Sequence, residues 1–172
     1  MIMPRGQQLL LPASPVFIAA SIAVALAINL LPLGRVVWMP DMVMLLLAFW
    51  SVHQPQRVGM GVAFVLGLCM DVHQTALLGQ HALAYTALVY GAGALSRRLL
   101  WLRVPAQALH LLPVFAAAHA LEVLVRMASG GIFPGLGLLI APAVETVLWP
   151  LASVVLLAPQ RRAPDRDETR PL

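Results

Sequence analysis

The chain has 172 residues, of which 60% are hydrophobic and 10% are charged, and its formal net charge is +4. Soluble domains carry about 25% charged residues, so this chain has too few charges to cover a surface that faces water. The composition therefore excludes an ordinary soluble domain and predicts an integral membrane protein. The positive charge does not indicate nucleic-acid binding, because the arginines follow the loops and form no basic face.

Apolar segments separated by short polar turns predict an all-α protein, a bundle of about six transmembrane helices. In chain order, the predicted spans are Val16–Leu33, Val36–Val52, Val58–Val72, Thr75–Leu95, Val104–Met127 and Leu136–Ala158. The second and third are shorter than the roughly 20 residues that cross a bilayer, so we expect them to start in the interface or to be buried by neighbours. Residues 159–172 are proline-rich and mixed in charge, which predicts a disordered tail after a transmembrane domain of residues 1–158.

The arginines predict the orientation of these spans. All 11 basic residues are arginines. If the N-terminus is inside, the outer turns hold only Arg35 and Arg126. The inner segments then hold the other nine, which are Arg5, Arg57, Arg97, Arg98, Arg103, Arg161, Arg162, Arg166 and Arg170. The positive-inside rule therefore predicts a multi-pass protein with both termini in the cytoplasm.

Four acidic residues lie in or beside the predicted spans, where a carboxylate facing lipid costs about 2.5–3.5 kcal/mol. Asp41 and Asp71 are expected at outer helix ends, Glu122 in the outer third of its span and Glu145 near the middle. Glu145 should therefore face other helices or a hydrated cleft. Pro142 and Pro150 on either side of it remove backbone donors, which predicts either a kink that a cleft would use or a packing feature.

His119, Glu122 and Arg126 share one helix face, because their spacing is i, i+3 and i+7. Glu122 and Arg126 are an acid-before-base pair at i,i+4, which predicts an ion pair. Together with Asp41 and Glu145, these residues define a candidate polar cleft open to the outside. Such a cleft would hold a cationic or polar solute, and a solute-binding subunit is the alternative to a structural role.

A stripe of small residues follows the third predicted span. Gly59, Ala63 and Gly67 are spaced four residues apart, and Asp71 continues the stripe by one turn. Small residues at this spacing let another backbone approach closely. The stripe is a candidate docking edge for a partner helix, although it equally indicates a compact bundle.

No metal, cofactor or catalytic site is predicted. Zinc needs three or four ligands in a defined geometry, whereas His73 and His81 stand eight residues apart around a turn. Asp41 and Asp71 could meet as paired acids, but no nucleophile with an adjacent base accompanies them. The interpretation left for Asp71 is a polar group of the outer turn that caps the next helix, with Gly79 breaking the chain's regularity.

The predicted inner loop Ser96–Arg103 alternates Arg97, Arg98 and Arg103 with leucine and tryptophan. This pattern indicates either an interfacial segment held by anionic lipid headgroups or a contact with a cytoplasmic partner.

Two stretches resemble the rod shape-determining protein MreD family. The first is W-M-P-D-M-V-M-L-L-L-A-F-W at residues 38–50. The second, at residues 53–85, contains R-x-G-x-x-x-A-F-x-x-G-L-x-x-D and then L-G-x-x-A-L. The N-terminal P-R-G-Q-Q-L-L-L-P-A-S-P looks like the proteobacterial branch of that family.

The resemblance implies a non-enzymatic inner-membrane component of the cell-elongation machinery. It implies binding to the bitopic protein MreC and, through the complex, association with MreB filaments, RodA and penicillin-binding protein 2. The expected role is control of rod shape and lateral peptidoglycan synthesis. The family is also similar in fold to the six-helix substrate-binding subunits of ECF vitamin transporters, which supports six spans and implies no vitamin ligand.

Overall fold

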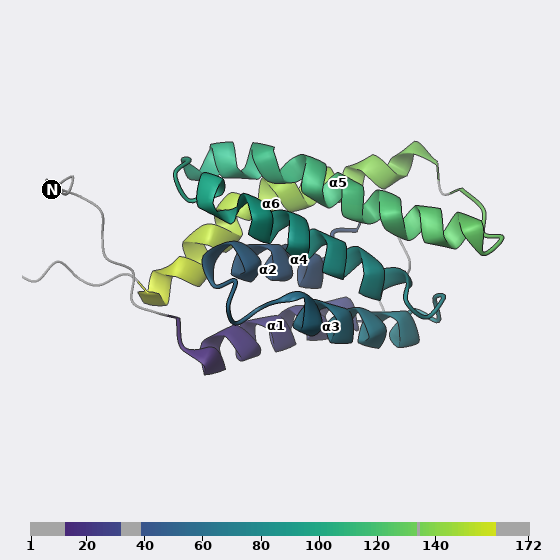
Figure 1. Ribbon diagram of the computed structural model, residues 1–172, viewed down its shortest axis with the longest axis horizontal. Helices are drawn as coiled ribbons and strands as arrows, with labels where there is room; N and C mark the ends of the chain where they lie inside the picture. The colour runs from purple at the N-terminus through teal and green to yellow at the C-terminus, as the bar shows by residue number, and fades with distance from the viewer. Residues whose placement is uncertain (1–12, 32–38, 134, 161–172) are drawn as a thin grey trace, which may run out of the picture.

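The computed structural model describes residues 13–31, 39–133 and 135–160, and within them it is all-helical. The helices are α1 (Pro15–Asn29), α2 (Met42–His53), α3 (Met60–His73), α4 (Gln80–Leu99), α5 (Val104–Ala128) and α6 (Ile140–Leu157). Two 3₁₀ turns, Leu136–Leu139 and Ala158–Gln160, flank α6. The prediction of an all-α protein is confirmed for these residues, and each predicted span overlaps one of the six helices (Figure 1).

Local chemistry explains where the observed helices begin. α2 starts at Met42, six residues later than the predicted span, because the Asp41 side chain accepts a hydrogen bond from the Met44 N–H at 2.9 Å and caps the helix. α4 starts at Gln80, because Gly79 has a φ of 103° that an L-residue rarely adopts. The predicted tail lies outside the described residues except for the two residues that close the second 3₁₀ turn.

The prolines of α6 differ in their effect. Pro142 falls in the first turn of the helix, where the missing N–H would have no intrahelical acceptor, so the expected break there does not occur. Pro150 lies inside α6 and does remove one backbone donor. The helix nevertheless runs as one element to Leu157.

Helix length alone does not decide how many helices cross a membrane. Two helical stretches, Val104–Ala128 and Gly137–Gln160, are long and apolar enough to span a bilayer, and α1, α2 and α3 are apolar but shorter. The 12 residues of α2 extend only about 18 Å, against the roughly 30 Å of hydrocarbon in a bilayer. The number of about six spans therefore stays a prediction.

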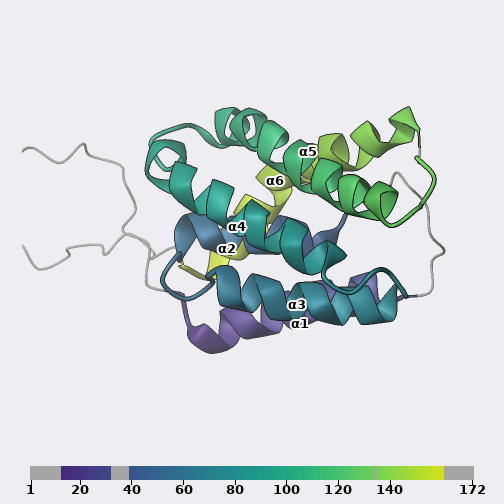
Figure 2. The same ribbon diagram turned by 45° about the vertical axis from the view of Figure 1, so that its right-hand side comes forward.

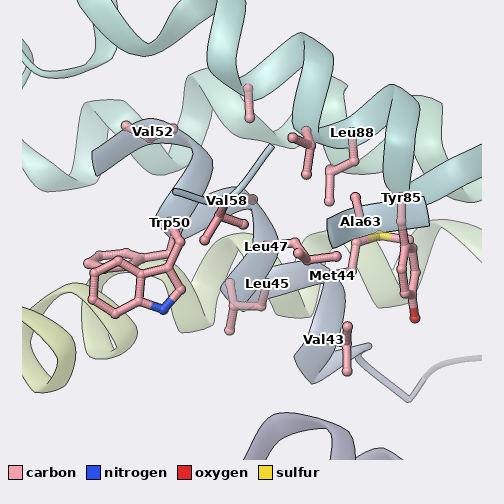
Figure 3. Packing of buried hydrophobic residues seen from close by; sticks show 14 of the residues in the cluster. Val43, Met44, Leu45, Leu47, Trp50, Val52, Val58, Ala63, Tyr85 and Leu88 are labelled. Carbon is pink, nitrogen blue, oxygen red and sulfur yellow. The ribbon is translucent and has the colours of Figure 1, made fainter. Parts of the chain in front are cut away.

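α2 and α4 form the centre of the bundle. Figures 1 and 2 show α1 and α3 along one edge and α5 along the opposite edge, with α2 and α4 between them. Side chains on all sides of α2 are buried, including Met44, Leu47 and Trp50, because α1, α4 and α6 surround it. Figure 3 shows α2 side chains facing Leu88 and Tyr85 of α4. This burial explains how a short apolar helix is accommodated, as the sequence suggested.

The surface of the bundle carries many large apolar side chains, while two acidic residues are buried inside it. Large apolar side chains point outward from the outer helices: Val16 is 74% exposed, Val65 58% and Val147 76%. Asp71 and Glu145, by contrast, are 1% and 0% exposed. This arrangement is expected of helices that face lipid, where acidic residues turn toward the bundle interior.

Candidate functional site

Polar side chains from five helices or their caps meet at one end of the bundle. We call the group the polar cluster; it consists of Asn29, Asp41, Tyr85, His119, Glu122 and Glu145. It joins the C-terminal ends of α1 and α5 to the N-terminal ends of α2, α4 and α6. Four of its members, Asp41, His119, Glu122 and Glu145, belong to the cleft predicted from the sequence.

Asp41 is the hub of the cluster. Its Oδ1 accepts hydrogen bonds from Asn29 Nδ2 at 2.6 Å and from the Met44 N–H at 2.9 Å. Its Oδ2 accepts a hydrogen bond from the Tyr85 hydroxyl. One carboxylate therefore caps α2 and ties it to α1 and α4.

Glu145 is fully buried behind Asp41. Its Oε1 lies 2.9 Å from the Asp41 N–H that donates to it and 2.9 Å from His119 Nε2, while its Oε2 has no partner among the described residues. The expectation that Glu145 turns toward other helices is confirmed by these contacts. These two contacts tie α6 to α5 and to the start of α2.

His119 lies between two carboxylates. Its Nε2 faces Glu145, and its Nδ1 lies 3.6 Å from Glu122 Oε2. The Nε2 contact has the length of a hydrogen bond, whereas the Nδ1 separation exceeds it. The His119 ring is therefore held mainly by Glu145.

The predicted ion pair between Glu122 and Arg126 is wrong. In the described part of the chain, Glu122 pairs with His119, and Arg126 makes no ion pair. His119 is buried on the inner face of α5, whereas Arg126 lies exposed in the last turn. The i,i+4 spacing permits an ion pair between Glu122 and Arg126, but the Glu122 carboxylate lies near His119 instead.

Asp71 caps α4 from a distance. Its carboxylate accepts hydrogen bonds from the N–H groups of Gly79 at 2.8 Å and His81 at 2.7 Å, and it lies 2.8 Å from His81 Nδ1. These contacts satisfy donors at the start of α4 that no helical carbonyl can reach. The interpretation of Asp71 as a polar group of the turn that caps the next helix is confirmed.

Most of the small-residue stripe faces the inside of the bundle. Ala63 is 0% exposed, and a Cβ at Gly67 would lie 2.3 Å from the Ala82 Cα of α4. The backbones of α3 and α4 therefore touch here, as the spacing allowed. At Gly59 and Gly61, by contrast, a Cβ would meet no atom within 4 Å.

A cavity of about 680 Å³ opens beside the polar cluster. Its polar lining comes from Asn29, Asp41, His73, Gln74, Thr75, Gln80, His81, His119, Glu122, Arg126 and Ser129, and its apolar lining includes Leu77, Val123 and Leu138. Within the described residues, no three His, Cys, Asp or Glu side chains are arranged to hold a metal ion. The cavity therefore offers hydrogen-bonding groups and charges to a ligand.

The opposite end of the bundle carries the other described arginines. Arg97 and Arg98 are exposed in the last turn of α4, where positive charge is favourable, and Arg103 is exposed just before α5. Trp101 between them is 92% exposed. Whether this loop contacts lipid headgroups or a protein stays a prediction.

Asn29 and Tyr85 were not predicted as members of the site. The available signal was weak: an amide at the end of an uncharged apolar run, and a phenol at a helical position that could face any neighbour. Only the packing of α1 and α4 against α2 brings both groups to Asp41.

The fold and site describe a helical protein with an apolar exterior and a buried polar cluster, as membrane-associated proteins have. The family model of the rod shape-determining protein MreD matches residues 7–160 of the chain. The chain therefore belongs to the MreD family, a membrane-associated family that determines rod cell shape and is not known as an enzyme family. No solved structure matches it.

Proposed function

We propose that the protein is a multi-pass, non-enzymatic scaffold of the cell-elongation complex in the bacterial inner membrane. In this role it holds a transmembrane helix of MreC and connects, through the complex, to MreB, RodA and penicillin-binding protein 2, and so to lateral peptidoglycan synthesis. The observation that carries the proposal is the exposure of large apolar side chains around a bundle that buries Asp71 and Glu145, in a chain of the MreD family.

The distribution of arginines supports an orientation for this scaffold. Arg57, Arg97, Arg98 and Arg103 lie at one end of the bundle, and Arg126 lies at the other, beside the cavity. The positive-inside rule places the four-arginine end in the cytoplasm, with both termini. The cavity and the polar cluster then face the periplasm.

The outward side of α3 is the docking surface that we propose for the partner helix. Gly59 and Gly61 leave room for a close backbone approach, and Val62 and Val65 beside them are 39% and 58% exposed. A groove of about 550 Å³ runs from here to α1, lined mostly by Ile18, Ile22, Val58 and Val62. Of the docking residues predicted from sequence, Gly59 belongs to this surface, while Ala63, Gly67 and Asp71 are engaged inside the bundle.

Two matched glycine substitutions test this proposal. Gly61→Leu fills the open surface of α3, and Gly93→Leu does the same on α4, where a Cβ also meets no atom within 4 Å. We expect Gly61→Leu to lower co-purification of MreC about fivefold at equal membrane abundance, a change of ~1 kcal/mol. Gly93→Leu should leave it unchanged. Equal co-purification by both variants would remove the α3 surface from the proposal.

The cavity favours a second candidate function, a small-solute-binding or transport subunit. Pockets of about 300–1,000 Å³ hold small molecules, and this cavity falls in that range. A small molecule detected by mass in gently purified protein that lacks MreC would support this function. Protein that carries the MreC helix and no small molecule would favour the scaffold.

A further inference from the structure

The cavity presents an anion and a cation that do not neutralise each other. Glu122 and Arg126 both line it, one turn of α5 apart, and they form no ion pair. Glu122 Oε1 has no hydrogen-bond partner in the described part of the chain, and its other oxygen is 3.6 Å from His119, beyond ordinary hydrogen-bond distance. Along the helix axis the two residues lie roughly 6 Å apart. The wall thus offers an acceptor and a guanidinium that, within the described residues, do not pair with each other.

A second carboxyl group, that of Glu145, lies behind the cavity wall. Glu145, 0% exposed, lies behind Asp41 and His119 and keeps one oxygen without a partner. Glu145 contacts Nε2 of the His119 ring, and Glu122 lies on the side of Nδ1 of the same ring. A ligand donor beside Glu122 would supply the partner that its Oε1 lacks among the described residues.

The size and lining of the cavity suit a small molecule. It measures about 680 Å³, within the range of small-molecule pockets. Leu77, Val123 and Leu138 give part of the wall an apolar character. A ligand with charged groups and an apolar part therefore fits both kinds of lining.

We propose that this cavity binds a zwitterion, whose ammonium group is held by Glu122 and whose anionic group is held by Arg126. Arginine suits the anionic group, because its planar guanidinium donates two parallel hydrogen bonds to a phosphate or a carboxylate. The zwitterion is either the headgroup of an ethanolamine phospholipid or a free aminophosphate or amino acid of the same chemistry. The binding chemistry goes beyond the scaffold function and does not depend on it; only the periplasmic location of the site rests on the proposed topology.

Native mass spectrometry of the full chain in detergent tests the proposal with three probes. The probes are phosphatidylethanolamine, phosphatidylglycerol with the same acyl chains, and water-soluble O-phosphoethanolamine. We expect a zwitterionic probe to bind in preference to phosphatidylglycerol. Binding of phosphatidylethanolamine alone identifies the lipid as the source, and binding of O-phosphoethanolamine without lipid identifies a soluble ligand.

Substitutions at the two charged side chains assign the site. Glu122→Gln and Arg126→Gln should each reduce the bound fraction about tenfold, because each removes a charge-assisted hydrogen bond. Arg97→Gln, at the opposite end of the bundle, should bind like the unaltered protein. Arg126 is exposed, so its variant keeps the test valid even if the Glu122 variant folds poorly. Unchanged binding in Arg126→Gln, or equal binding of phosphatidylglycerol and both zwitterions, would overturn the proposal.

Discussion

Glu145 shows at the level of single residues how a carboxylate is accommodated in an apolar protein. It is reached by two donors that lie 104 and 26 residues away in sequence, the Asp41 N–H and His119 Nε2. Removing one member of such a buried group leaves the others without a partner, which costs more than the group itself contributes. The loss of free energy of unfolding in a Glu145 variant therefore depends on whether the new side chain keeps a hydrogen-bond acceptor.

We expect Glu145→Leu to lower the free energy of unfolding by about 3–5 kcal/mol, because the Asp41 N–H and the His119 ring lose their acceptor. Glu145→Gln keeps one acceptor oxygen and should lose markedly less. Thermal unfolding of the two purified variants beside the unaltered protein measures the difference. Similar stability of all three would show that these hydrogen bonds do not hold the helix ends together.

Contacts between elements decide what the small residues do. Gly67 and Gly61 lie on the same helix, α3, yet a Cβ at Gly67 would collide with the α4 backbone and a Cβ at Gly61 would meet nothing. The collision involves backbone atoms, which cannot move aside as the tip of a side chain can. Because Asp71 also caps α4 from α3, the two helices form one tightly coupled pair.

Gly67→Ala should therefore destabilise the protein by at least about 1–3 kcal/mol, the usual cost of overpacking a close contact. Gly61→Ala makes the same chemical change in open space, and we expect it to be neutral or slightly stabilising, since alanine favours a helix more than glycine does. Chemical unfolding of the two variants under identical conditions gives the comparison. A stable Gly67→Ala variant would mean that the α3–α4 contact is looser than described.

At the scale of the whole molecule, the two ends of the bundle differ in chemistry. One end has the cavity, the polar cluster and Arg126, and the other has the exposed residues Arg57, Arg97, Arg98 and Arg103. The proposed orientation requires the first end to face the periplasm. Residues that are strongly exposed at each end can report which side they occupy.

Single cysteines at two such positions test the orientation, in a background where the exposed Cys69 is replaced by alanine. Ile132, 86% exposed, lies at the cavity end, and Trp101, 92% exposed, lies at the arginine end. In intact spheroplasts, a membrane-impermeant maleimide should label the cysteine at 132 and reach the one at 101 only after lysis. The reverse pattern would invert the topology and place the cavity in the cytoplasm.

The sequence by itself determined the helical class, the approximate position of each helix, the family, and the break in the chain at Gly79. These features depend on hydropathy, short motifs and local backbone chemistry, all of which are carried by residues close together in the chain. Only the tertiary structure decided which neighbour each polar side chain meets. Spacing places Glu122, His119 and Arg126 on one face of α5, but the packing of α6 makes His119 the partner of Glu122 and Glu145, and leaves Arg126 free of any described ion pair. The helical repeat sets the direction in which a side chain points from its helix. Which residue lies in that direction depends on how helices far apart in sequence pack together.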